Sequence, residues 1–97
     1  MSSKPITAST TAVAAENALS TTIDEEVVIL QQEAGEYYGL NEVATFIWEL
    51  LEEPQTINEI CEAVTTEYDV THERCKPDVT TMLAELAEKE LVTLSEE

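Results

Sequence analysis

Few residues of this sequence combine in a way that could perform chemistry, and the main candidates are one histidine and two cysteines. His72 is the only histidine, and no second ligand stands at a spacing that would complete a zinc site. Cys61 falls on the apolar side of a predicted helix, where cysteine packs as a small hydrophobic residue. Cys75 lies between Arg74 and Lys76 in a predicted loose turn, and these positive charges favour a thiolate. These residues form no catalytic pair, so we predict no catalysis, no metal and no cofactor.

The charge of the chain restricts the partners that it can bind. Its 97 residues include 21 Asp and Glu against 4 Lys and Arg, which gives a formal net charge of −17. Such a surface repels nucleic-acid phosphates and anionic lipids, and it also keeps a small protein soluble. No apolar run reaches transmembrane length, and residues 1–20 lack the features of a secretory signal. We therefore expect a cytoplasmic protein that binds neither nucleic acid nor membrane.

The elements that must position a binding site belong to one predicted domain, residues 19–94. Residues 1–18 are rich in Ser, Thr and Ala and predict a flexible N-terminal tail. Short apolar runs between turn residues then predict three strands, at 19–23, 27–31 and 36–40. Their short connections indicate an antiparallel meander in which the third strand is an edge. The middle strand is apolar on both faces, so we expect its second face to be covered.

Helical spacing begins where the third predicted strand ends. Asn41 is the predicted N-cap of a helix with apolar residues at i, i+3, i+4, i+7 and i+8. These are Val43, Phe46, Ile47, Leu50 and Leu51. Thr56 begins a capping box for a second helix. The third helix is predicted to run from Pro77 to Glu90 after a loose turn over 72–76, since proline is harmless at a first helical position. The predicted class is α+β, a three-stranded antiparallel sheet followed by a three-helix, winged-helix-like unit.

An edge strand beside a helix offers a groove for an extended peptide. The free N–H and C=O groups of such a strand can pair with an added strand. Each main-chain hydrogen bond stabilises the complex by about 0.5–1.5 kcal/mol, whereas ordering each peptide residue costs about 1–2 kcal/mol of conformational entropy. Apolar anchors must therefore add affinity. Candidate walls are Tyr37, Tyr38, Met82, Leu83 and Leu86, and a core role is the alternative for each, favoured for the two leucines. Because strand residues alternate, we expect Tyr38 to face the core and Tyr37 to face away.

The sequence also resembles a known family through several blocks with consistent spacing. They are Tyr38-Gly39-Leu40-Asn41, Ile47-Trp48-Glu49-Leu50-Leu51, Thr56-Ile57-Asn58-Glu59-Ile60, Tyr68-Asp69-Val70, Asp78-Val79, Leu83-Ala84-Glu85-Leu86 and Leu91-Val92. Over residues 26–94 they look like the PqqD-like family, the recognition elements for ribosomally synthesised and post-translationally modified peptides (RiPPs). The runs YYGLNEV and IWELL are most similar to small standalone members of lasso peptide biosynthesis. The sequence departs from the family at Lys76-Pro77, where relatives continue with helix-forming residues.

The resemblance implies a three-stranded sheet with a winged-helix unit and the function of a non-catalytic adaptor. The leader segment of a precursor peptide would add to the third strand, in the cleft under the third helix. It would then be presented to a maturation enzyme, such as the lasso leader protease. The residues that the resemblance places along this cleft are Glu36, Tyr37, Tyr38, Gly39, Leu40, Asp78, Val79, Met82, Leu83 and Leu86.

Several alternatives stay open. The same scaffold could act as a PqqD-type peptide chaperone in another modified-peptide or quinone-cofactor pathway. The apolar second face of the middle strand could mediate a homodimer or docking to a partner enzyme. Trp48, at the edge of the first helix's apolar stripe, fits packing against the N-terminal segment as well as contact with a partner. A winged-helix regulator of DNA is disfavoured, because residues 71–91 hold three cations, Arg74, Lys76 and Lys89, against five acids.

Overall fold

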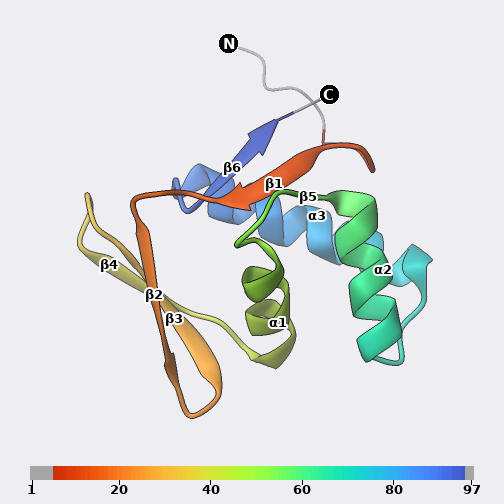
Figure 1. The fold of residues 1–97 in the computed structure, drawn as a ribbon, viewed down its shortest axis with the longest axis horizontal. Helices are drawn as coiled ribbons and strands as arrows, with labels where there is room; N and C mark the ends of the chain where they lie inside the picture. Colours follow the sequence, from red (N-terminus) through yellow and green to blue (C-terminus); the bar gives the residue numbers. More distant parts are fainter. Residues whose placement is uncertain (1–5, 96–97) are drawn as a thin grey trace.

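The computed structural model describes residues 6–95, which form two small antiparallel sheets and three helices (Figure 1). The first sheet has the strand order β2-β3-β4, made of Ala18–Ile23, Glu26–Gln31 and Glu36–Gly39. The helices that follow are α1 (Glu42–Leu50), α2 (Ile57–Glu67) and α3 (His72–Glu88). The predicted α+β class, with three antiparallel strands before three helices, is confirmed. None of the helices in this part of the chain is long and apolar enough to cross a membrane.

The second sheet is built from segments that sequence analysis did not assign to strands. Its order is β5-β1-β6, made of Gln55–Thr56, Thr11–Ala14 and Val92–Ser95. The side chain of Ala12 is fully buried, and the Ala14 N–H donates to the Leu51 carbonyl at 2.9 Å. This corrects the predicted flexible tail at residues 11–14, because small residues leave no hydrophobic period yet allow a strand to lie close to the helices. Residues 1–5 of that predicted tail lie outside the described residues.

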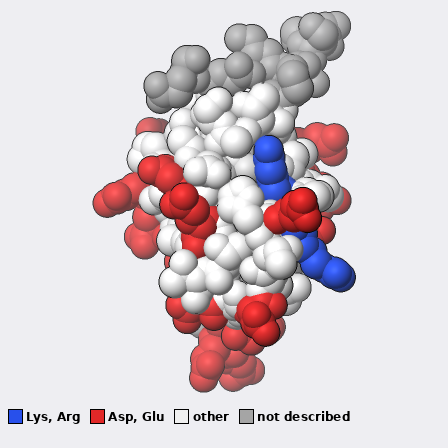
Figure 2. All heavy atoms as spheres, turned by 90° about the vertical axis from the view of Figure 1, so that its right-hand side faces the viewer, with Lys and Arg blue, Asp and Glu red and all other residues white. Residues whose placement is uncertain are grey.

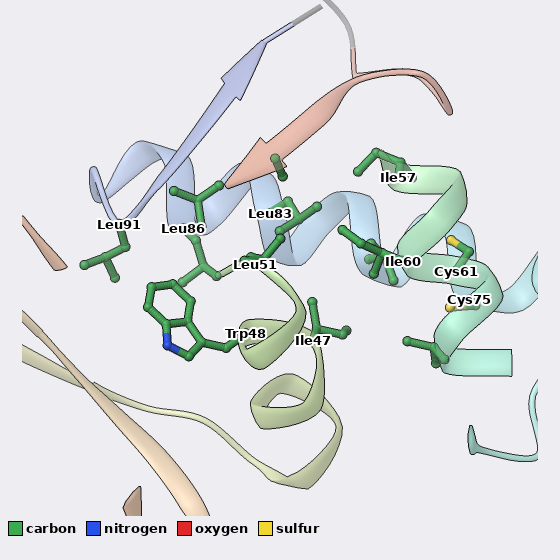
Figure 3. Close-up of a cluster of buried hydrophobic side chains, with 14 of the residues drawn as sticks. Ile47, Trp48, Leu51, Ile57, Ile60, Cys61, Cys75, Leu83, Leu86 and Leu91 are labelled. Atoms are coloured by element: carbon green, nitrogen blue, oxygen red, sulfur yellow. The ribbon is translucent and has the colours of Figure 1, made fainter. Parts of the chain in front are cut away.

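The core lies between the three helices, and buried residues of β1, β3 and β6 pack against it (Figure 3). Residues of β3 alternate, so that Val27 and Ile29 are buried against the helices while Val28 and Leu30 are only half-buried. The Thr45 hydroxyl of α1 accepts the Val27 N–H at 2.9 Å, which fastens β3 to the helix. Trp48 is also buried in this cluster, so its side chain is not available for a partner.

The starts of α1 and α2 agree with the capping residues predicted from the sequence, whereas the start of α3 does not. The side chain of Asn41 accepts the Ala44 N–H, and Thr56 with Glu59 forms a complete capping box, as predicted. The predicted start of the third helix at Pro77 is wrong, because α3 already begins at His72 with Thr71 as its N-cap. The first turn of α3 is held by buried Cys75, which packs on α2, and this outweighs the hydrogen bond that Pro77 removes.

Non-glycine residues with left-handed backbone conformation mark two turns. Asp24 and Glu25, with φ of 52° and 71°, form the two-residue connection between β2 and β3. Glu90, with φ of 62°, follows the end of α3. Its N–H donates to the Ala87 carbonyl at 3.0 Å, and the Leu91 N–H donates to the Leu86 carbonyl at 2.9 Å. A side chain at this position strains the backbone, since only glycine adopts the conformation freely.

We therefore expect Glu90→Gly to stabilise the protein. Removing the Cβ should raise the free energy of unfolding by about 1 kcal/mol, the cost of a left-handed conformation. Urea denaturation monitored by circular dichroism measures this change. Glu88→Gly is the matched control: Glu88 is the last residue of α3, and glycine should lower the stability there by a few tenths to about 1 kcal/mol. Equal effects at both positions would contradict the assignment of strain to Glu90.

Candidate functional site

The strand β4 has an open edge. It pairs with β3 alone among the described strands, which confirms the predicted edge strand. The Leu40 N–H donates to the Val27 carbonyl at 2.8 Å. Because hydrogen-bonded and non-hydrogen-bonded pairs alternate in an antiparallel ladder, Tyr38 also bonds towards β3, whereas Tyr37 and Gly39 direct their N–H and C=O groups to the open edge. The edge therefore offers main-chain donors and acceptors to another strand.

An apolar hollow of about 460 Å³ opens between α1 and α3, just beyond the end of β4. From α3 it is lined by Val79 and half-buried Met82, with exposed Asp78 beside them. The further lining residues are Asn41, Val43, Ala44, Ile47, Val64, Val70, Arg74 and Cys75. Most of these side chains are aliphatic, so the hollow suits an apolar anchor residue of a bound chain.

The part of this hollow that comes from α1 and from the turn before α3 was not predicted from the sequence. Val43 was predicted on the core face of the first helix, but it is 39% exposed and lines the hollow. Val70 in the turn is 40% exposed and lines it as well. The available signal was an apolar stripe on the first helix that begins one turn before Ile47, the first buried aliphatic residue of that helix.

A second hollow, of about 430 Å³, lies at the opposite end of β4 beside the C-terminal end of α3. Glu36 and Tyr38 line it from β4, and Lys89 with its two neighbours lines it from the helix. The Lys89 Nζ atom lies 5.0 Å from the centroid of the Tyr38 ring, a cation–π distance. The Tyr38 hydroxyl donates to Glu36 Oε1 at 2.6 Å, and this carboxylate raises the pKa of Tyr38. One hollow thus lies at each end of β4.

The structure distributes the ten residues predicted along the cleft over several environments. Asp78, Val79 and Met82 line the apolar hollow, and Glu36 and Tyr38 line the second one. Gly39 and Leu40 line a third hollow beside the β2–β3 turn. The remaining three, Tyr37, Leu83 and Leu86, line none of these hollows.

Of those three residues, two lie in the core and one lies on the surface. Leu83 and Leu86 are buried in the core, the alternative that the sequence favoured. Tyr37 is 71% exposed on the side of the sheet away from the helices, whereas Tyr38 packs against the core. The predicted opposite orientation of the two tyrosines is confirmed.

The two cysteines pack together where α2 meets α3 (Figure 3). Burial raises the pKa of Cys61, and burial together with the Cys61 thiol raises the pKa of Cys75 to about 11. The predicted tendency of Cys75 towards a thiolate is therefore wrong, because its segment is a helix that buries the thiol. His72 Nε2 lies 3.1 Å from Asn58 Oδ1. Across residues 6–95 no three potential ligands cluster in a way that could hold a metal ion.

We expect Cys75 to be unreactive in the folded protein. At pH 8 a thiol with a pKa of about 11 is about 100-fold less ionised than one at the ordinary value of 9. Reaction with Ellman's reagent should be slow in native buffer and fast in denaturing urea. Because the pKa of Cys75 is raised in the folded state, the contribution of this thiol to the free energy of unfolding should be fully present below about pH 9. It should be lost as the pH rises towards 11. Rapid native labelling of Cys75, assigned in a Cys61→Ala variant, would contradict this environment.

Positive charge is scarce, and part of it lies at the apolar hollow. Arg74, Lys76 and Lys89 are the cations within residues 6–95, and Arg74 lines the hollow. Figure 2 shows the end of the molecule on the side of α2, where Asp and Glu are spread over the surface and Lys and Arg lie along one side. A bound chain with basic residues would be attracted by most of this surface, and its association should slow as salt rises.

Comparisons with known proteins agree with this architecture. The family model described as "Coenzyme PQQ synthesis protein D (PqqD)" matches residues 26–92. A structure of TbiB1 in complex with the TbiA(beta) leader peptide is 39% identical, with a TM-score of 0.77 over 82% of this chain and 93% of that chain. A lasso peptide synthetase B1 complexed with the leader peptide has a TM-score of 0.76 over 84% and 96% of the two chains. At 22% identity it shows the shared fold alone. A search of curated proteins found no significant match.

Proposed function

Because the chain belongs to the PqqD family, as its sequence blocks predicted, we propose that it is a non-catalytic adaptor for the leader segment of a ribosomally synthesised precursor peptide. The observation that carries this proposal is the open edge of β4 next to the apolar hollow between α1 and α3. The 39% identical TbiB1 was solved with a leader peptide, which supports the same class of ligand. The runs YYGLNEV and IWELL favour lasso peptide biosynthesis as the pathway.

The leader binds by strand addition in this proposal. The backbone groups of Tyr37 and Gly39 pair with the incoming chain, and these hydrogen bonds set its register. Hydrogen bonds of about 0.5–1.5 kcal/mol each barely offset the ordering of the peptide. An apolar side chain that buries about 100 Å² in the hollow beside Met82 adds about 2.5 kcal/mol. Strand pairing therefore provides orientation, and the hollow provides much of the affinity.

The bound leader is then presented to a maturation enzyme, for which we propose the lasso leader protease. The domain holds the leader extended along β4, with the rest of the precursor projecting beyond the domain. An extended segment of this kind suits a protease, which cleaves peptides in an extended conformation. Cleavage belongs to the partner enzyme, and the contribution of the domain is to raise the local concentration of its substrate.

Two measurements test this function. Titration with a fluorescein-labelled leader peptide measures binding, and hydrogen exchange followed by NMR measures the protection of single amides in the complex. Saturable binding should protect the amides of Tyr37 and Gly39, whose N–H groups face the open edge. The Tyr38 amide, already paired with β3, should change little and is the internal control. Saturable binding without new protection at Tyr37 and Gly39 would exclude strand addition, and no binding at high micromolar peptide would overturn the proposed function.

A PqqD-type chaperone role in a quinone-cofactor pathway is the second candidate, because the matching family model carries the name of coenzyme PQQ synthesis. The two candidates differ in the precursor that the cleft accepts. Parallel titrations with a lasso leader and with the precursor peptide of a quinone cofactor distinguish them. At least tenfold tighter binding of one peptide would assign the pathway.

A further inference from the structure

The side of the β2-β3-β4 sheet that faces away from the helices carries a connected apolar surface. The strand register places Leu19 opposite Leu30 and Leu30 opposite Tyr37, so these three residues form one row across the sheet. Because strand residues alternate, Ile23 and Val28 lie on the same side. We name these five residues the outward sheet face. It is the second face of the apolar middle strand for which the sequence predicted a cover.

Nothing in the described part of the chain covers the outward sheet face. Leu19 is 52% exposed, Ile23 57% and Tyr37 71%, whereas Val28 and Leu30 in the middle are half-buried by their neighbours. In Figure 1 the helices all lie to the other side of this sheet. Val27 and Ile29, which point towards the helices, are buried. A small, highly charged domain that leaves such a row exposed has a surface suited to another protein.

The charges around this face argue against a second copy of the chain as its partner. The β2–β3 turn contributes Asp24 and Glu25, β3 begins with Glu26, and the β3–β4 turn contributes Glu33. Residues 18–39 contain no Lys or Arg. Two copies packed through this face would bring equal acidic borders within the screening distance of about 8 Å at physiological salt. A partner with an apolar patch bordered by Lys and Arg is complementary instead.

The outward sheet face is continuous with the proposed leader site. Tyr37 belongs to this face, and its backbone lies on the open edge of β4. A leader strand added to that edge would place every second side chain on the same side as Tyr37. The bound leader would thus enlarge the outward sheet face by one strand, and a protein docked there would contact sheet and leader together.

We propose that the outward sheet face is the docking surface for the maturation enzyme, which presents an apolar patch bordered by basic residues. This inference rests on the proposed leader-binding function and adds the surface through which the complex is recognised. It accounts for an exposed row of Leu19, Leu30 and Tyr37 that neither the core nor the hollow uses. It also explains how a partner can distinguish the loaded domain from the free one.

The test uses the full chain, its leader peptide and the purified leader protease of the same pathway, with protease binding measured by biolayer interferometry. The double variant Leu19→Glu/Ile23→Glu changes two residues that are more than half exposed, so the fold should persist. It should weaken protease binding at least tenfold and leave leader affinity unchanged. Ser20→Glu/Thr22→Glu, on the opposite side of the same strand and with the same added charge, is the matched control and should bind the protease normally.

Two further measurements keep the proposal separate from leader binding itself. Protease affinity should rise several-fold when the leader is bound and fall as salt increases. Unchanged protease binding by Leu19→Glu/Ile23→Glu, or no protease binding by the wild-type domain that binds leader, would overturn the docking surface while the proposed leader binding stands. Sedimentation that shows a wild-type dimer dissociated by the same double variant would also overturn it, because a second copy would then be the occupant.

Discussion

Replacing Met82 with aspartate is expected to weaken leader binding at least about 30-fold, which corresponds to about 2 kcal/mol. Met82 is half-buried and lines the apolar hollow next to buried Val79. A carboxylate there would lose its water when a leader side chain fills the hollow, and the hollow offers mainly aliphatic neighbours in return. Fluorescence anisotropy with a labelled leader peptide measures the loss, and circular dichroism checks that the variant is folded.

Ala84→Asp is the matched control for Met82→Asp. Ala84 is exposed on the same helix and lines none of the hollows described above. The new aspartate there has the same charge and a similar effect on helix propensity, so its leader affinity should stay within about twofold of the wild type. Equal losses in both variants would mean that added charge, and not the hollow, controls binding. An unchanged affinity in Met82→Asp would remove the hollow from the binding site.

Replacing the adjacent Leu83 with alanine should instead lower the free energy of unfolding by about 2–5 kcal/mol, the range for large-to-small changes in a core. Leu83 has no exposed surface and is among the largest fully buried side chains. Truncation leaves a cavity between α3 and the rest of the core, because the packed neighbours collapse only in part. Urea denaturation measures the change, and the leader affinity of the folded fraction should stay close to that of the wild type.

Glu85→Ala provides the comparison, since Glu85 is an exposed residue of the same helix. Its substitution should change stability by less than about 0.5 kcal/mol. A loss below about 1 kcal/mol for Leu83→Ala, with weakened leader binding, would place Leu83 in the groove and contradict its core position. The pair Met82 and Leu83 thus separates binding from stability at two consecutive positions of α3.

The first sheet and α2 could be predicted because their signals are local. Alternation and turn residues defined β2, β3 and β4 to within about one residue, and the capping box at Thr56 fixed the start of α2. β1 was missed because the small residues of Thr11–Ala14 leave no apolar period. The start of α3 was misplaced because the conformational cost of Pro77 was weighed without the packing of Cys75 on α2, which only the folded chain shows.

The candidate site was predictable only where one element specified it. The alternation of Tyr37 and Tyr38 follows from strand geometry alone, and the structure agrees with it. The apolar hollow joins α1, α2 and α3, and the contributions of Val43, Val70 and Arg74 depend on tertiary packing. Sequence periodicity assigned Val43 to the core because it cannot show how far a core extends along a helix.

The pairing of β1 with β6 has a consequence for engineering. Thr11 lies opposite Ser95, so the two ends of the described chain leave the domain side by side, in a sheet separate from the one that contains β4. Either end can therefore be fused to another protein without blocking the leader edge, and the whole domain can be inserted into a surface loop. A covalent fusion to a maturation enzyme would replace bimolecular encounter by a millimolar-range effective concentration, set by the length of the linker.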